Sequence, residues 1–584
     1  MSNKPASDKY LPMSRRTFLH GLGVLALGTA VEALTGCSST LTESPTALPP
    51  TGTLLPPTAT VPSPTTTPSP TATPVPDLPL FDWARLAPVT VAHDPLAEGY
   101  PRDLPFDPDS AYPEYPFGNA IAHSTNAAYR LVREALRLFN PAGYGTPGWN
   151  PLGRIIQPGD RVLIKPNLVD AGYWQNGQMT HPAFLRPVID YVYRACGPGG
   201  SIMLGDAPWS VEVFPRLVVN TGIQDMVAYL AATHGVPIRL VDLNIAEPQN
   251  TPLVDLGTLS ELRQVQRTWY DAHGKAMHDG DDPGIGRYRI APAVLEADVI
   301  VNVPKAKVHC SGGITAAMKN MVGLIPAWDG PHGDGALKEC AHTSDVDQAG
   351  GRRGMYLEND TIWRSMADLN RILLYADAQG TLRATPQRRY VCLVDAITAA
   401  EASQYQPQPF SLNTVIIGAD PISVDAVTAR CMGFDPRQLK SVMQAAVRQE
   451  LPLGPSTPAR IRVITADQQG LNAHFRQALK PETQIYSWEG VLEARDFDPP
   501  RILATGWDEH SGTLQVTLHD PSGVSWVRVN YIADGEQRTK DLTLVEGSPV
   551  EGLWSVPFPR REALSGATLL ASDALFNEMM QEPR

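Results

Sequence analysis

The chain has 584 residues, 43% of them hydrophobic and 19% charged, with a formal net charge of −13. This length suggests roughly three or four domains of about 150 residues each, with enough apolar content for a sizeable core. The acidic balance, without a long basic segment, argues against a nucleic-acid partner, because binding to a phosphate backbone needs a basic stripe.

Residues 1–37 are typical of an export signal that ends in a lipid attachment site. Arg15 and Arg16 precede an apolar stretch, 21–30, that is too short for a transmembrane helix. The pair resembles a twin-arginine signal, and Leu-Thr-Gly-Cys at 34–37 resembles a lipobox in which Cys37 becomes the lipidated first residue. We therefore expect an extracytoplasmic protein anchored to the cell membrane through Cys37.

Residues 38–79 consist mainly of proline, threonine and serine, with almost no charged or aromatic side chains. Such a segment buries too little surface to offset the entropy lost on ordering. We expect a disordered, extended stalk between the lipid anchor and the folded body.

Residues 80–498 alternate between short β-rich runs and helical stretches, which predicts an α/β domain. The expected strands cover 88–93, 161–166, 201–206, 237–242, 298–304, 390–396, 413–420 and 461–467. The expected helices cover 124–139, 182–195, 223–234, 361–378 and 421–432, with another after the glycines at 312–313. Continuous Val/Ile/Leu strands between helices indicate a mainly parallel sheet covered on both faces.

Charged and amide side chains follow several of these strands. Because ligands bind beyond the carboxyl ends of parallel strands, we expect these side chains to share one edge of the sheet. The lysines suit an anionic ligand, and the carboxylates suit a divalent cation or proton transfer. The predicted anion ligands are Lys165, Lys305, Lys307 and Lys319. The predicted metal-binding or proton-transferring groups are Asp206, Asp395 and Glu401, the last placed a short loop after its strand.

The stretch from 301 to 324 supports the anion-binding half of this hypothesis. Gly312 and Gly313 would let the backbone approach a ligand, and the helix expected after them would present free N–H groups. Lys319 lies four residues after Thr315, so we expect both side chains on one face of that helix.

Several of these residues also have structural interpretations. A single lysine at a strand end is often solvated, and Asp206 and Asp395 could cap helices or form turns. Asp420 before Pro421 predicts a helix N-cap. His181 also lies at a helix start, where it either caps the helix or contributes to a site.

Metal or redox chemistry is a further hypothesis, based on cysteine and histidine residues. His309 and Cys310 could form a metal pair, although neighbouring residues of an extended chain point in opposite directions. The glycine-rich stretch 328–345 could hold a metal or act as a lid. The sequence has no CxxC spacing, and Cys392 and Cys431 occur in apolar contexts that predict buried thiols.

Residues 499–584 contain short runs between Gly, Asp and Pro turns, without a helix signal. This pattern predicts a small antiparallel β-sandwich of immunoglobulin-like type. We expect an accessory spacer or a module that binds a surface polymer or a protein.

Six blocks of the sequence resemble the signature of the domain of unknown function 362 family. They are IKPNLV (164–169), THP (180–182), GDAP (205–208), VNVPKAKVHCSGGITAAMKNMVGL (301–324), VDAITAAEASQYQP (394–407) and IIGADPISVDAVTARCMGFDP (416–436). The resemblance covers about 85–470 and implies an α/β fold. It also implies a shared site at Lys165, Asn167, Lys305, Lys307, Lys319 and Asn320. Family members often carry ferredoxin-type cysteine clusters, and the missing CxxC spacing argues against an iron–sulfur cluster here.

The main functional hypothesis is an exported, membrane-anchored protein whose pocket binds a small anionic molecule, with or without a divalent metal. Whether the pocket is catalytic is left open by the sequence. One alternative is a non-enzymatic surface-binding or scaffold module, and another is a redox or metal-carrier protein.

Overall fold

The structure is a computed structural model, and it describes most of the chain from residue 87 to residue 581. The residues outside the description are 1–86, 123, 170–176, 245–250, 265–268, 271–275, 278–285, 327–358, 403–406, 458–459, 467–470, 472–474, 476–493, 559–563 and 582–584. By internal contacts the chain divides into a unit of residues 1–79 and a unit of residues 80–584. The signal, Cys37, the stalk and the glycine-rich stretch 328–345 therefore lie outside the described residues.

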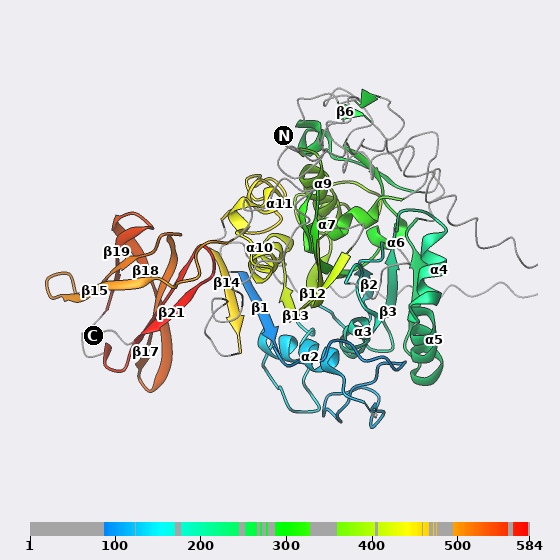
Figure 1. Cartoon of the computed structure of the whole chain (residues 1–584), viewed down its shortest axis with the longest axis horizontal. Coiled ribbons are helices and arrows are strands. Elements are labelled where there is room, and N and C mark those ends of the chain that lie inside the picture. The colour runs from blue at the N-terminus through cyan, green and yellow to red at the C-terminus, as the bar shows by residue number, and fades with distance from the viewer. Residues whose placement is uncertain are drawn as a thin grey trace, which may run out of the picture. The chain divides into compact units, whose positions relative to one another are not determined.

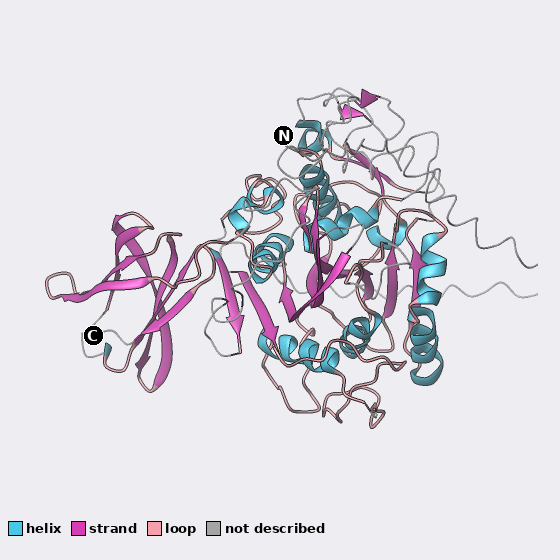
Figure 2. Ribbon diagram, in the orientation of Figure 1, coloured by secondary structure: helices cyan, strands magenta, loops and turns pink. Residues whose placement is uncertain are grey.

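A ten-stranded sheet forms the centre of the α/β region (Figures 1 and 2). Its main path runs β14 (Ile461–Thr465), β1 (Ala87–His93), β13 (Pro407–Gly418), β12 (Arg389–Ala402), β9 (Val299–Val303), β2 (Arg161–Pro166), β3 (Ser201–Asp206) and β4 (Ile238–Asp242). Along this path β13 alone runs against its two neighbours, so the expectation of a largely parallel sheet is confirmed. Off the path, β10 (Lys305–His309) pairs parallel with β12 and antiparallel with β11 (Gly313–Thr315).

Helices cover both faces of the sheet, as expected for an α/β fold (Figure 2). One face packs against α2 (Ala127–Phe139), α3 (Pro182–Cys196), α4 (Val213–Asn220) and α5 (Ile223–His234). The other packs against α6 (Pro292–Leu295), α7 (Ala317–Asn320), α9 (Ile362–Tyr375), α10 (Pro421–Cys431) and α11 (Lys440–Met443). Among the described residues, no helix is both long enough and apolar enough to span a bilayer.

Short elements complete the α/β region. Single 3₁₀ turns occupy Gly257–Leu259, Leu262–Gln264, Met321–Leu324 and Pro436–Gln438. Two small antiparallel pairs join β5 (Leu253–Asp255) to β8 (Arg287–Arg289) and β6 (Trp269–Tyr270) to β7 (Ala276–Met277).

The strand β9 shows why its sequence reads as a continuous apolar run. Val299, Val301 and Val303 belong to the core beneath α2 and α3, whereas Ile300 belongs to the core beneath α9 and α10. Because successive side chains of a strand alternate between faces, a strand that is covered on both faces needs apolar residues at consecutive positions.

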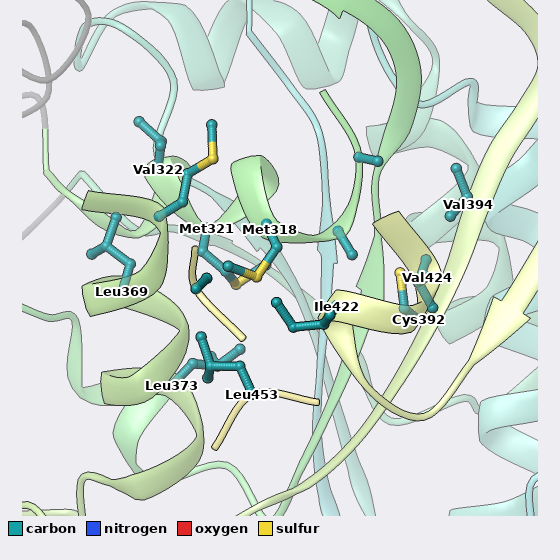
Figure 3. Close-up of a cluster of buried hydrophobic side chains, with 14 of the residues drawn as sticks. Met318, Met321, Val322, Leu369, Leu373, Cys392, Val394, Ile422, Val424 and Leu453 are labelled. Carbon is teal, nitrogen blue, oxygen red and sulfur yellow. The ribbon is translucent and has the colours of Figure 1, made fainter. Parts of the chain in front are cut away.

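Figure 3 shows part of the second of these cores, which includes side chains of α7 and of the 3₁₀ turn that follows it. Met318, Met321 and Val322 pack there with Leu369 and Leu373 of α9, Cys392 of β12 and Ile422 of α10. Cys392 and Cys431 are fully buried, as predicted, and the described cysteines are free thiols. This packing holds the segment that carries Lys319 and Asn320 against the sheet.

Two local predictions near the sheet edge were wrong, and one point was not foreseen. Lys305 and Lys307, which were expected only to follow the strand β9, lie on a strand of their own, β10. Thr315 ends β11 and faces Lys307 across the β10–β11 pair, so Thr315 and Lys319 do not share a helical face. Glu401 lies within β12, because β12 and β13 form one long hairpin where a loop was expected.

The helix expected after Gly312 and Gly313 is shorter than predicted. Its α-helical part, α7, spans four residues and is followed at once by a 3₁₀ turn. Four residues are too few to give the aligned N–H groups and dipole that an anion cradle at a helix start requires. The backbone cradle is therefore absent, and any anion site here depends on side chains.

The two predicted helix caps are present. The Asp420 carboxylate accepts a hydrogen bond from the Ser423 N–H at 2.7 Å, with Pro421 in the first turn of α10. The His181 Nδ1 accepts from the Ala183 N–H at 3.1 Å and so caps α3.

The C-terminal region forms a seven-stranded antiparallel sheet of sandwich-like type (Figure 1). In spatial order its strands are β15 (Arg501–Asp508), β16 (Thr513–His519), β19 (Glu551–Pro557), β18 (Glu536–Gly547), β17 (Val524–Ala533), β20 (Thr568–Asp573) and β21 (Glu578–Gln581). Alternate residues of β16, such as Leu514, Val516 and Leu518, point into its core. The expected antiparallel arrangement is confirmed.

Candidate functional site

A buried ion pair lies at the carboxyl ends of β2 and β3. The Lys165 Nζ is 2.5 Å from the Asp206 Oδ1 and also donates to the Pro166 carbonyl at 2.9 Å and to the Asn320 Oδ1 at 3.3 Å. An ammonium group has three hydrogens, so Lys165 has an acceptor for each of them. Burial lowers the pKa of Lys165, and the attraction of Asp206 opposes that shift. We infer that Lys165 holds this edge of the site together.

Asp206 is fixed by backbone groups as well as by Lys165. Its carboxylate accepts from the Leu168 N–H at 2.6 Å and from the Ala207 N–H at 2.9 Å. Gly323 approaches the pair so closely that a Cβ added there would lie 2.2 Å from the Asp206 Oδ1 and 2.7 Å from the Lys165 Nζ. Position 323 therefore accommodates only glycine, because any side chain there would displace the Lys165–Asp206 ion pair.

Amide side chains link the ion pair to β10. The Asn167 Nδ2 donates to the Asn320 Oδ1 at 3.2 Å, and the Asn320 Nδ2 donates to the Asn302 Oδ1 at 2.7 Å. Thr180 fixes the backbone of Asn167, since its Oγ1 accepts from the Asn167 N–H at 2.9 Å. On the other side, the Lys307 Nζ donates to the Asn167 Oδ1 at 3.3 Å.

Lys307 and Lys319 add positive charge to this network. The Lys307 Nζ donates to the Gln178 backbone carbonyl at 2.7 Å, in addition to the Asn167 Oδ1. Both of these acceptors are neutral oxygens. Burial lowers the pKa of Lys307 well below its usual range, and the charges of Lys319 and Lys305 lower it further. Burial lowers the pKa of Lys319 to about 8. Burial removes water from an ammonium group, and the loss of this hydration favours the neutral amine.

A second group of polar side chains surrounds Lys305. Its Nζ lies 3.0 Å from the Asp395 Oδ2 and donates to the Tyr100 hydroxyl at 2.6 Å. The Tyr100 hydroxyl donates to the Asp395 Oδ1 at 2.5 Å, and the Tyr100 ring stacks on His181 with centroids 3.9 Å apart. Burial, followed by the charge of Asp395, raises the pKa of Tyr100 well above its usual range, so the phenol keeps its proton.

Asp395 is the common acceptor of this second group. Besides Tyr100 and Lys305, the His181 N–H donates to its Oδ2 at 2.9 Å and the Ile397 N–H to its Oδ1 at 3.4 Å. Four donors around one fully buried carboxylate favour a positioning role for Asp395 over proton transfer with a ligand. His181 thus combines capping of α3 with a place in this group.

A pocket opens next to the first ion pair and has a volume of about 390 Å³, including the space at its mouth. Its polar lining comes from Asn167, Asp206, Lys319 and Asn320. Its remaining lining residues are Leu168, Val169, Ala207, Pro208, Trp209, Val322 and Gly323. Small-molecule sites commonly combine an apolar lining with a few polar groups, as this pocket does.

Most of the predicted site residues come together in one connected arrangement, and Cys310 lies within electrostatic reach of Lys319. Lys165, Asn167, Asp206, Lys305, Lys307, Lys319, Asn320 and Asp395 form the connected arrangement described above. Glu401 lies farther along β12, opposite Gln408. The His309 Nδ1 accepts from the N–H groups of Ser311 and Gly312, at 3.1 Å each, so this ring nitrogen is used within the chain. Cys310 is buried, with its thiol 3.4 Å from the Ser311 hydroxyl.

In the described part of the chain, a grouping of carboxylates suited to a metal lies elsewhere. Asp496, Asp520 and Asp573 have ligand atoms within 4.8 Å of one another. The predicted metal ligands Asp206, Asp395, His309 and Cys310 do not form such a grouping among the described residues.

Sequence reasoning missed several residues of the site. Tyr100 lies in an irregular segment before α2, where nothing in the local pattern marks it. Asn302 is inside the apolar run of β9, and a polar residue within such a run was a usable signal. Trp209 follows the Gly-Asp-Ala-Pro block directly, so proximity to a recognised block was also a signal.

Comparison with known proteins gives a family match for the α/β region. The model of the Domain of unknown function (DUF362) matches residues 162–430, which is less than half of the chain. The matched range contains every residue of the site except Tyr100. The resemblance inferred from the sequence blocks is thus supported, over a narrower range.

One curated relative and two solved structures were compared with the chain. Thylakoid-associated protein sll1697 of Synechocystis sp. is 25% identical over 175 residues, which are 30% of this chain and 42% of the relative's length. The two solved structures are a double mutant of a Cellulomonas fimi endo-beta-1,4-mannanase and an engineered protein. Each is 13% identical to this chain, and each alignment covers 80% of this chain and 83% of the other protein's chain. Their TM-scores, 0.16 and 0.14, are too low to indicate a shared fold.

Proposed function

We propose that this chain is an exported, membrane-anchored protein that binds a small molecule bearing a phosphate or carboxylate group in the pocket beside Asp206. The observation that carries the proposal is the position of Lys319. It lines the pocket together with the amides of Asn167 and Asn320, and its pKa is lowered to about 8.

The charge of the network supports an anionic ligand. Lys165 and Lys305 form ion pairs with Asp206 and Asp395, and the charges of Lys319 and Lys305 lower the pKa of Lys307 in the same buried region. Desolvation and mutual repulsion make this arrangement costly. A bound anion would relieve that cost, since an opposite charge nearby favours the protonated form of both lysines.

Each group has a distinct role in this proposal. Lys319 contacts the anion directly, and Asn167 orients it through the amide hydrogen that it does not donate to Asn320. The Asn320 amide donates to the Lys165 carbonyl and to the Asn302 Oδ1, and so holds the lining in place. Lys165 positions Asp206, which lines the pocket. The group around Lys305 supports the neighbouring strand β10, which carries Lys307.

The test is calorimetric titration of the full chain with inorganic sulfate, which keeps its charge across the working pH range. Binding should be strongest below pH 8 and should fall by about tenfold per pH unit above it, because only protonated Lys319 attracts the anion. At pH 8 the complex should take up about half a proton, since Lys319 is then half protonated when free.

A pair of variants separates a site effect from a general charge effect. Lys319→Gln should abolish sulfate binding and its pH dependence. Lys540→Gln changes a partly exposed lysine of β18 that does not line the pocket, and it should leave both unchanged. Equal binding in the two variants, or binding that does not change between pH 7 and pH 10, would reject the proposal.

The membrane location is a separate part of the proposal. It is supported by the twin-arginine and lipobox patterns and by the name of the Synechocystis relative, which describes it as thylakoid-associated. Fractionation after Cys37→Ser should move the protein from the membrane to the soluble extracytoplasmic fraction.

A further inference from the structure

The pocket has an apolar wall that anion binding alone does not explain. Trp209 lines this wall with 45% of its surface exposed, and Val211, two residues later, is 41% exposed. Leu168, Val169 and Val322 belong to the same lining. Single exposed apolar residues are ordinary on protein surfaces, but an exposed indole at the mouth of a pocket is a contact surface for a ligand.

The backbone around Trp209 is fixed on both sides. The buried Asn244 donates from its Nδ2 to the Pro208 carbonyl at 3.2 Å and to the Ser210 carbonyl at 3.3 Å. The Ala207 N–H donates to the Gly323 carbonyl at 3.0 Å, which joins this segment to the opposite wall of the pocket. A backbone held in this way loses little conformational entropy when a ligand binds to the side chain that it carries.

The polar and apolar parts of the lining are close in the chain and in space. Asp206 is the last residue of β3, and Trp209 follows it three residues later. Lys319 lies in α7, and Val322, three residues later, lies in the 3₁₀ turn that follows this helix. All four line one pocket of about 390 Å³. A ligand that fills it must therefore present its charge and its apolar surface within a few bonds of each other.

We infer that the ligand is a small organic anion in which the phosphate or carboxylate group is attached directly to an aromatic ring or a short apolar group. This inference rests on the proposed anion site. Lys319 binds the charged group, and Trp209 determines specificity by stacking against the apolar part.

The experiment compares methyl phosphate with phenyl phosphate, which carry the same phosphate monoester group and differ in their apolar part. Titration of the full chain at pH 7 should give at least about tenfold tighter binding of phenyl phosphate, corresponding to about 1.4 kcal/mol. Trp209→Ala should reduce this ratio to about twofold or less and leave the affinity for methyl phosphate unchanged. Lys319→Gln should weaken both ligands by the same factor.

Val219→Ala is the matched control, because Val219 is 55% exposed on α4 and does not line the pocket. It should keep the wild-type ratio, and the melting temperatures of all variants show whether they are folded. Equal affinities for the two esters, or a ratio that does not depend on Trp209, would overturn this inference and leave the anion site standing. Failure of the wild-type protein to bind either ester would reject the anion site itself, and the inference with it.

A competition experiment identifies the source of the apolar group. Vesicles that contain phosphatidic acid should displace phenyl phosphate if the natural ligand is a lipid. Tight binding of phenyl phosphate without such displacement assigns a soluble organic anion. Displacement by the vesicles would contradict the inferred ligand class, because the phosphate of phosphatidic acid is attached to glycerol and not to an aromatic ring or a short apolar group; binding without displacement supports the class.

Discussion

At the scale of single residues, the site depends on how its buried charges are compensated. Lys165 and Lys305 each have a carboxylate partner, while Lys307 donates to neutral oxygens. Breaking a buried pair by removing one partner commonly costs about 3–5 kcal/mol, because the remaining charge has lost its water. An added atom that displaces either ion pair should therefore lower the free energy of unfolding substantially.

Gly323→Ala provides a test at this scale. The added methyl group would lie 2.2 Å from the Asp206 Oδ1, so the Lys165–Asp206 pair must move. We expect a loss of about 1–3 kcal/mol in the free energy of unfolding and at least tenfold weaker anion binding. Denaturant unfolding and titration with sulfate measure the two effects.

Gly199→Ala is the control for this prediction. Gly199 is exposed, and a Cβ added there would meet no atom within 4 Å. The free energy of unfolding of this variant should stay within about 0.5 kcal/mol of the wild-type value. If both variants behave alike, Gly323 is not needed to accommodate the ion pair.

At the scale of elements, the chain after β9 explains how Lys305 and Lys307 reach the site. Pro304 has no N–H to continue the ladder, so β9 ends and β10 begins a new pairing with β12. The Pro304 carbonyl accepts from the Asp395 N–H at 2.9 Å, which places the start of β10 beside the Asp395 carboxylate. The positions of these lysines are thus a consequence of strand pairing.

The start of α10 gives a prediction with a defined pH dependence. Burial raises the pKa of Asp420 to about 6, above the value of about 3.9 for an unfolded aspartate. The proton is bound more tightly in the folded state, so the stability that this group contributes is complete below about pH 4 and is lost as the pH rises through 6.

Asp420→Asn removes this titration and keeps a side chain that can cap the helix. The stability of the wild type relative to this variant should therefore fall between pH 4.5 and pH 7, as measured by denaturant unfolding. Asp420→Ala should cost about 1 kcal/mol more than the asparagine variant, since it also removes the hydrogen bond to Ser423. A constant difference between wild type and Asp420→Asn over that pH range would contradict the prediction.

At the scale of the whole molecule, Arg430 joins the α/β region to the C-terminal sheet region. This fully buried side chain of α10 donates to the Phe475 carbonyl at 2.6 Å, to the Leu575 carbonyl at 3.0 Å and to the Asn577 Oδ1 at 3.0 Å. Its guanidinium also lies 5.1 Å from the centroid of the Phe497 ring. One side chain thus donates to acceptors from two separate segments, around Phe475 and at 575–577.

Arg430→Met should destabilise the protein by about 3 kcal/mol or more, because it leaves buried acceptors without donors. We also expect calorimetry to resolve a separate transition for the C-terminal sheet in this variant. The control is Arg437→Met. Arg437 is partly exposed and donates to the Ser522 carbonyl at 2.9 Å, so this variant should lose about 1 kcal/mol or less of the free energy of unfolding. A single transition and equal losses in both variants would argue against coupling through Arg430.

Much of the fold could be predicted because local patterns specify it. The apolar runs of β2, β3 and β9 and the alternating residues of β16 identified strands, and Asp420 with Pro421 identified the start of α10. The predictions failed where a segment's structure depends on a distant partner. β10 and the long β12–β13 hairpin exist because of pairing across the sheet, which the periodicity of either segment does not encode.

The amino-acid sequence by itself determined the kind of fold and the set of polar residues at the carboxyl ends of the strands, because side-chain period and turn chemistry act over a few residues. The tertiary structure alone decided the role of each polar residue. It paired Lys165 with Asp206 and Lys305 with Asp395, brought Tyr100 to the second pair from a segment without a local signal, and placed Lys319 and Trp209 in one pocket. The physical reason is that burial and the distance between charges, which set their energies, arise only when remote segments pack together.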